Sequence, residues 1–124
     1  MKELTESLFF GTWRSYKAFL NSGNVKNHTK DTYLEFVFND DRQLSISSHE
    51  HGKMKKLYDT KDWKVFFKDK RHYLSIGGKG EEYEIITINH VALVLMDTQT
   101  MEKYFCARLP TWETYVKSPA ATVL

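Results

Sequence analysis

The chain has 124 residues, of which 41% are hydrophobic and 15% aromatic, and its formal net charge is +2. This length and composition indicate one globular domain and exclude a disordered or membrane-spanning chain. A charge so close to balance gives no reason to expect a nucleic-acid partner. The N-terminus lacks the apolar core of a signal peptide and Cys106 is the single cysteine, so we expect a cytoplasmic protein without an intrachain disulfide.

The first expected element is a short helical turn, and strands follow it. Leu4 and Leu8 lie four residues apart and predict one or two helical turns, which Gly11 ends. Beyond Gly11, apolar and polar residues alternate in short runs that turn residues separate, a pattern typical of strands. These runs cover residues 12–20, 32–38, 44–49, 63–67, 73–76, 83–88, 91–96 and 101–109.

The segments between these strands are expected to be turns and loops. Residues 21–31 are predicted to form a turn and a loop, residues 53–57 are ambiguous between a loop and a short strand, and residues 77–80 predict the strongest turn. Pro110 ends the last strand. Aromatic and apolar residues at 112, 115 and 116 then predict one or two helical turns docked on the domain, and residues 118–124 are expected to fray.

Eight strands in tandem with short connections predict the fold class. We expect a single all-β domain over residues 1–124, an eight-stranded antiparallel up-and-down barrel with a short N-terminal helical turn. Such a barrel closes when its first and last strands pair. Trp13 on the first strand and Arg108 on the last would then be neighbours, close enough for a cation–π stack.

The triplet Gly11-Thr12-Trp13 at the start of the first strand, the late Arg108 and the eight-strand meander between them resemble the lipocalins, and more closely the compact lipocalin-like domains of bacteria. The resemblance covers residues 4 to about 116. It implies that Trp13 packs inside the closed end of the barrel and that Arg108 lies across it, as a structural pair. The chain lacks the disulfide and the long C-terminal helix of the secreted lipocalins, so extracellular transport is not implied.

Alternation along the strands predicts which side chains line the barrel. Starting from Trp13 and Arg108, and from the more apolar face of each middle strand, the expected interior and ligand-binding residues are Ser15, Lys17, Phe36, Phe38, Ile46, Tyr104 and Cys106. Lys17 is the one cation among them. Two interpretations stay open: Lys17 holds the acidic group of a ligand, or it lies at the barrel mouth, in water or paired with Glu35.

No pattern in the sequence predicts catalysis, a metal site or a cofactor. His49 and His51 lie two residues apart on one strand face, but two ligands do not complete a zinc site, and we expect that face to be solvated. Cys106 has no histidine placed beside it and is interpreted as a small apolar filler. The basic stretch of residues 64–71 is interpreted as a solvated edge.

Three functions remain open at this point. The first is non-covalent binding of a small, largely apolar or amphipathic ligand inside the barrel, with Lys17 and Tyr104 orienting it. The second is an interaction module, for example a homodimer, with a filled barrel. The third is a cavity enzyme such as an isomerase or a hydratase. An exposed aromatic patch would favour the second function, and a large internal void would favour the other two.

Overall fold

The computed structural model describes residues 6–77 and 81–116. Leu4, most of the predicted turn of residues 77–80 and the predicted frayed tail of residues 118–124 lie outside the described residues. Among the described residues, no helix is long and apolar enough to cross a membrane.

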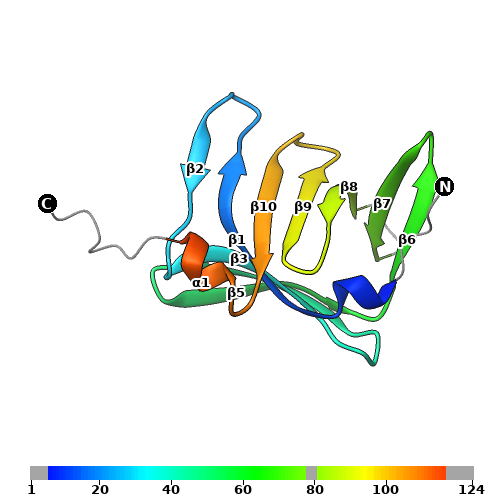
Figure 1. Ribbon diagram of the computed structural model, residues 1–124, viewed down its shortest axis with the longest axis horizontal. Coiled ribbons are helices and arrows are strands. Elements are labelled where there is room, and N and C mark those ends of the chain that lie inside the picture. Colours follow the sequence, from blue (N-terminus) through cyan, green and yellow to red (C-terminus); the bar gives the residue numbers. More distant parts are fainter. Residues whose placement is uncertain (1–5, 78–80, 117–124) are drawn as a thin grey trace, which may run out of the picture.

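The described chain is all-β, as predicted, with short helical segments at its two ends (Figure 1). The 3₁₀ turn η1 (Glu6–Phe9) precedes the strands, and the helix α1 (Trp112–Tyr115) follows them. The strands are β1 (Gly11–Phe19), β2 (Val25–Asn27), β3 (Thr32–Phe38), β4 (Leu44–Glu50), β5 (Lys53–Thr60), β6 (Trp63–Lys68), β7 (Arg71–Ile76), β8 (Glu81–Ile88), β9 (Ala92–Asp97) and β10 (Lys103–Arg108).

All strands belong to one antiparallel sheet that curls into a half-barrel (Figure 1). The strand order is β5-β4-β3-β1-β10-β9-β8-β7-β6. The first and last strands pair, as expected, and Trp13 lies opposite Arg108. One edge of β1 is shared: residues 11–14 pair with β3, and residues 17–19 pair with β2. The loop and turn before β3 therefore carry an additional strand along the outer part of β1.

Two predictions about the sheet are wrong. The described residues form ten strands, where the sequence predicts eight. The three residues of β2 are all exposed, so backbone pairing alone defines this strand and no side-chain pattern reveals it. The sequence of β5 contains three lysines and does not alternate between apolar and polar residues, and only Tyr58 and Thr60 are partly buried. Among the described residues β5 and β6 do not pair, so the sheet is a half-barrel and not a closed barrel.

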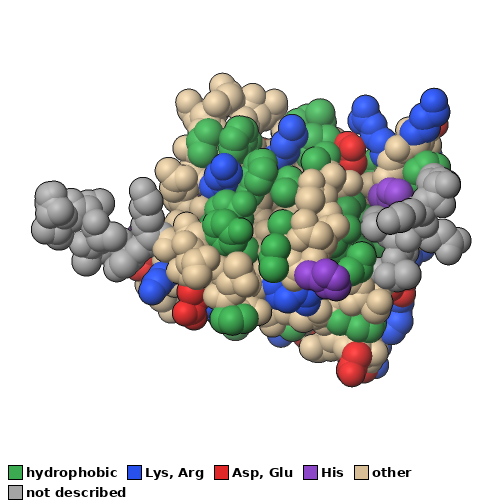
Figure 2. All heavy atoms as spheres, in the orientation of Figure 1, with side chains coloured by type: hydrophobic (Ala, Val, Ile, Leu, Met, Phe, Trp, Pro, Cys, Tyr) green, Lys and Arg blue, Asp and Glu red, His purple; other side chains and the backbone are tan. Residues whose placement is uncertain are grey.

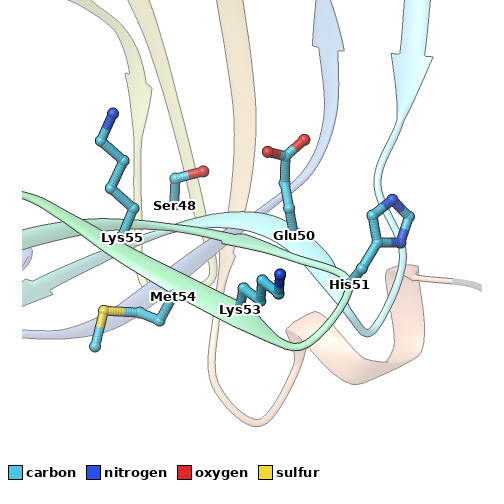
Figure 3. Close-up of a pocket in the computed structure, with 6 residues that line it drawn as sticks. All are labelled: Ser48, Glu50, His51, Lys53, Met54 and Lys55. Atoms are coloured by element: carbon cyan, nitrogen blue, oxygen red, sulfur yellow. The ribbon is translucent and has the colours of Figure 1, made fainter.

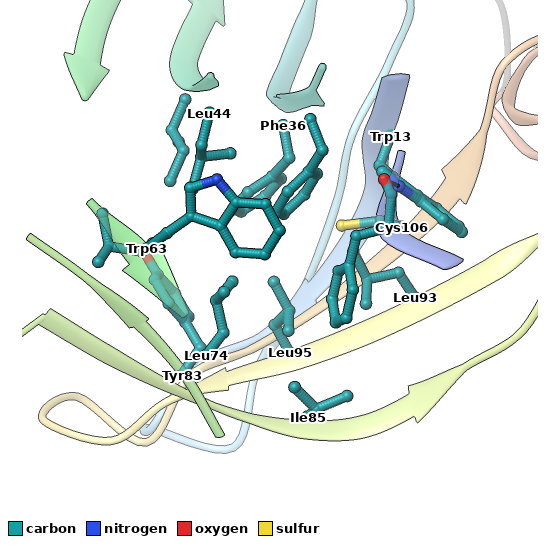
Figure 4. Close-up of a cluster of buried hydrophobic side chains, with 14 residues drawn as sticks. Trp13, Phe36, Leu44, Trp63, Leu74, Tyr83, Ile85, Leu93, Leu95 and Cys106 are labelled. Carbon is teal, nitrogen blue, oxygen red and sulfur yellow. Dashed lines mark hydrogen bonds between the residues drawn. The ribbon is translucent and has the colours of Figure 1, made fainter. Parts of the chain in front are cut away.

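The concave side of the half-barrel is filled by a continuous apolar core (Figure 4). Strands β3, β4, β7, β8 and β9 contribute two alternate residues each, and β1 and β10 contribute one each. Trp63 at the start of β6 packs edge-on against Phe38, with ring centroids 5.2 Å apart. Burying side chains of this size stabilises a fold by about 1.5–3 kcal/mol each. The fourteen core residues are Phe9, Trp13, Phe36, Phe38, Leu44, Ile46, Trp63, Leu74, Ile76, Tyr83, Ile85, Leu93, Leu95 and Cys106.

Trp13 and Arg108 close one end of this core. The Trp13 side chain is fully buried and its indole Nε1 donates a hydrogen bond to the Phe9 carbonyl at 2.8 Å. The Arg108 guanidinium lies 4.1 Å above the Trp13 ring. It also donates hydrogen bonds to the carbonyls of Leu8 at 2.7 Å, of His90 at 2.9 Å, and of Phe10. One side chain therefore ties η1 and the turn between β8 and β9 to the end of β10.

Gly11 is required by this arrangement. Its φ is +127°, which side-chain-bearing residues rarely adopt, and a Cβ built there would collide with Nη1 of Arg108. The glycine of the Gly-x-Trp triplet thus makes room for the guanidinium that covers the tryptophan.

We predict that Gly11→Ala lowers the free energy of unfolding by about 1–3 kcal/mol, because it adds both backbone strain and a collision with Arg108. Urea denaturation measures this loss. The loss should be smaller when Gly11→Ala is made in an Arg108→Ala background, where only the backbone strain remains. An equal loss in both backgrounds would show that the collision contributes nothing.

Candidate functional site

A β-bulge in β1 decides which wall of the sheet each residue faces. Ser15 pairs with Cys106, whereas Lys17 pairs with Phe105, so one extra residue is inserted between the two pairs. A bulge of this kind reverses the alternation beyond it. Ala18 consequently takes the inward position and is buried. Lys17 faces the outer wall with Phe105, and its Nζ lies 4.9 Å from the Phe105 ring centroid.

The prediction that Lys17 lines the barrel interior is therefore wrong, and the bulge is the reason. Its suggested pairing with Glu35 is absent too. The Glu35 carboxylate accepts a hydrogen bond from Nε of Arg14 at 2.8 Å, and Nε2 of His49 lies 3.6 Å from it. Among the described residues Lys17 forms no ion pair. Its charge is available to a molecule that binds on the outer wall.

The other six predicted interior residues do lie on the concave side. Phe36, Phe38, Ile46 and Cys106 belong to the apolar core, and Tyr104 packs against it partly buried. Burial raises the pKa of the Cys106 thiol, which stays a neutral filler. The Tyr104 hydroxyl donates a hydrogen bond to Glu102 at 2.9 Å. Burial and that contact raise the pKa of Tyr104. The sixth residue, Ser15, is fully buried and has a different role.

Ser15 holds a buried histidine in one orientation. Its Oγ lies 2.5 Å from Nδ1 of His28 and accepts a hydrogen bond from the Leu34 backbone N–H at 2.9 Å. The tautomer of the imidazole decides which of the two groups donates, because the Ser15 hydroxyl can donate to a bare Nδ1 or accept from Nδ1–H. Burial, with a smaller effect of Lys26, lowers the pKa of His28.

A surface pocket of about 290 Å³ opens over His28 and is lined by residues of β1, β2 and α1. We call it the outer-wall pocket. His28 is 7% exposed, and because Ser15 occupies Nδ1, Nε2 is the ring nitrogen left for a ligand. The pocket is lined by Tyr16, Lys17, Asn27, His28, Thr29 and Tyr115.

An aromatic surface surrounds the Lys17 side of this pocket. The rings of Tyr16 and Tyr115 are stacked, with centroids 4.7 Å apart and an interplanar angle of 15°. Phe19 lies 5.1 Å from Phe105, and Nζ of Lys17 lies 5.4 Å from the Phe19 ring. Hydrophobic side chains gather over β1 and β10 on this face in Figure 2. The aromatic rings hold the ammonium group through cation–π contacts and leave it free of carboxylates.

Two more surface pockets adjoin the outer-wall pocket. One of about 440 Å³ shares Asn27 and Thr29 with it. The other, of about 340 Å³, shares Glu50 and His51 with the second pocket. Figure 3 shows this third pocket, in which Glu50 and Lys55 rise from the β4–β5 hairpin on the same side as Ser48, with His51 at the turn.

The two histidines of the β4 region occupy different places. His49 lies on the outer wall, stacked on Tyr33 at 4.5 Å, and its Nε2 lies 3.1 Å from Oγ of Ser47. Glu35 approaches the same nitrogen, so the three groups do not form a relay, in which serine and carboxylate occupy opposite nitrogens. His51 is in the following turn with a φ of +51°. Among the residues with described positions, no group of three or more ligating side chains could hold a metal ion.

The chain matches no protein-family model, no curated protein and no solved structure.

We predict that His28 makes stability depend on pH. Its pKa in the folded state lies below the ordinary value of 6.5, so below pH 6.5 the unfolded chain binds more protons than the folded one. The stability that neutral His28 contributes is complete above pH 6.5 and is lost as the pH falls through 6.5 toward the folded-state pKa. Urea denaturation from about pH 5 to about pH 8 measures this loss.

The matched variant is His28→Asn, which keeps an acceptor near the position of Nδ1 and removes the titrating ring. The wild-type protein should lose stability relative to this variant as the pH falls. Parallel curves for the two proteins would contradict the assignment of a neutral buried His28.

Proposed function

We propose that this protein binds, non-covalently, a small planar molecule that carries an acidic group, and that it does so in the outer-wall pocket. The observation that carries the proposal is the juxtaposition of Lys17, without an ion pair among the described residues, and the buried His28 beside the stacked Tyr16–Tyr115 pair. Specific pockets combine apolar walls with a few fixed polar groups in this way.

Each part of the pocket favours the same ligand chemistry. The ammonium of Lys17 is a charged donor, and Nε2 of His28 donates beside it in the Nε2–H tautomer, so the pocket suits a carboxylate or a sulfonate. The exposed faces of the tyrosines suit a flat apolar body, because aromatic rings stack with offset geometry. The Ser15–His28 hydrogen bond fixes the imidazole before a ligand arrives, which reduces the entropy cost of binding.

The ligand class is the one that the sequence favours, and the site is different. The apolar core occupies the concave side, whereas Lys17 belongs to the outer wall. The resemblance to the lipocalins stays a prediction, which the β1–β10 pairing and the Trp13–Arg108 stack support.

An interaction module is the second candidate, and the exposed apolar surface beside the pocket favours it. Phe19, Val25 and Tyr115 are 39%, 50% and 48% exposed, respectively. Contiguous exposed apolar side chains mark binding surfaces more often than scattered ones do. A partner protein could therefore supply the bound group.

We predict that anilinonaphthalene sulfonate (ANS), an aromatic anion, binds to the folded protein and that Lys17→Met weakens the binding about fivefold. The expected loss is about 1 kcal/mol, the contribution of a charged contact at a partly exposed site. Fluorescence titration measures the affinity. The matched control is Lys64→Met, which removes an exposed lysine on β6 far from the pocket and should leave the affinity unchanged. Equal affinities in the parent and Lys17→Met would exclude Lys17 from the site.

The aromatic wall has a matched control as well. Tyr115→Ala removes one ring of the Tyr16–Tyr115 stack and should weaken ANS binding. Tyr73→Ala removes a ring from a second stacked pair, Phe66–Tyr73, which has centroids 5.3 Å apart on β6 and β7. That variant should bind ANS as the parent does. Equal losses in both variants would indicate non-specific binding to surface rings, and a protein that does not bind ANS would contradict the proposal.

A further inference from the structure

We propose that the acidic group in the outer-wall pocket belongs to an extended acidic segment of a partner protein. The segment would run from this pocket past β2 to the β4–β5 hairpin. This inference rests on the proposed function and specifies the kind of molecule to which the bound acidic group belongs.

The three surface pockets adjoin one another at the rim of the half-barrel, and we call them together the rim groove. By register, Ser48, Glu50 and Lys55 of the hairpin pocket share the inward parity of Ile46, so the rim groove leads from the outer wall over the rim toward the concave side. The outer-wall pocket and the middle pocket share Asn27 and Thr29, and the middle pocket and the hairpin pocket share Glu50 and His51. A compact molecule fills one pocket of about 290 Å³, whereas an extended chain can occupy all three.

The charge of the rim groove selects an acidic chain. Four lysines line it, namely Lys17, Lys26, Lys53 and Lys55. None of the four forms an ion pair among the described residues. Two carboxylates line it as well, and one of them, Asp31, already accepts a hydrogen bond from Oγ1 of Thr29 at 2.6 Å. Lysines at intervals along a groove complement carboxylates at intervals along a ligand.

The backbone of β2 favours a peptide over other polyanions. β2 pairs with β1 along one edge, and no other described strand pairs with its second edge. Lys26 and Asn27 of this strand line the rim groove. Unpaired N–H and C=O groups on an edge strand can accept one more strand, whose alternate side chains then enter pockets. Lys26 on this edge repels a second copy of the same strand and attracts an acidic one.

Binding of a synthetic peptide tests the inference. The peptide alternates glutamate with valine and ends in phenylalanine with a free carboxylate, so that the ring and carboxylate can enter the outer-wall pocket. Isothermal titration calorimetry compares it with acetyl-phenylalanine, which can fill that pocket alone. We expect the peptide to bind at least tenfold more tightly. Methylation of alternate backbone nitrogens of the peptide should remove most of this gain, because it blocks pairing with β2.

The variant that isolates the groove is the double substitution Lys53→Glu and Lys55→Glu, which lies outside the outer-wall pocket. This double substitution should lower the affinity for the peptide at least tenfold and leave the affinity for ANS unchanged. The matched control, Lys64→Glu with Lys68→Glu on β6, should change neither. If ANS binds but the peptide binds no better than acetyl-phenylalanine, the inference is overturned and the proposed function stands.

Three further results would overturn the inference, and the first of them would overturn the proposed function as well. Failure of ANS, acetyl-phenylalanine and the peptide together would overturn the proposed function and the inference with it. Peptide binding that is insensitive to the double substitution would overturn the inference. Tighter binding of an acidic oligosaccharide than of the peptide would also overturn it, because a sugar chain cannot pair with β2.

Discussion

One extra residue in β1 reverses the two faces of the strand halfway along it. Before the bulge, Trp13 belongs to the apolar core and Ser15 is buried, and beyond the bulge Ala18 is the inward residue. Tyr16 and Lys17 then join Phe105 on the outer wall. A regular strand would place Lys17 in the core, where an unpaired cation is costly. The bulge avoids that cost and provides the outer-wall pocket with its cation.

Beside this bulge, a single hydroxyl links β1, β3 and the residue that follows β2. Ser15 is the last inward residue before it, and its Oγ contacts both Nδ1 of His28 and the backbone N–H of Leu34. The carbonyl of Tyr16 accepts a hydrogen bond from the His28 backbone N–H at 3.0 Å, which begins the pairing that places β2 along β1. The pocket therefore lies against a hydrogen-bonded part of the sheet, while its charged lining stays at the surface. Substitutions of the lining residues can therefore change binding without removing side chains from the apolar core.

Sequence patterns predict the parts of the structure in which each strand has one apolar face. Phe36, Phe38 and Ile46 lie in strands whose inward and outward residues alternate without interruption at these positions, so the alternation correctly predicts that they face inward. The first strand has no such guide, because both Tyr16 and Phe19 are aromatic while the inward Ala18 is small, so no local pattern marks the bulge. Its bulge depends on pairing with residues about ninety positions away. The pocket is hidden from local patterns for the same reason, since Tyr115 joins His28 only through the fold.

The face of the sheet that binds an aromatic anion can be determined directly by nuclear magnetic resonance titration of isotope-labelled protein with ANS. The outer-wall site predicts that the largest shift changes occur at the amides of Lys17, His28 and Tyr115. Changes concentrated at the inward residues Ile46, Leu95 and Cys106, with the outer-wall amides unchanged, would contradict it and return the ligand to the concave side.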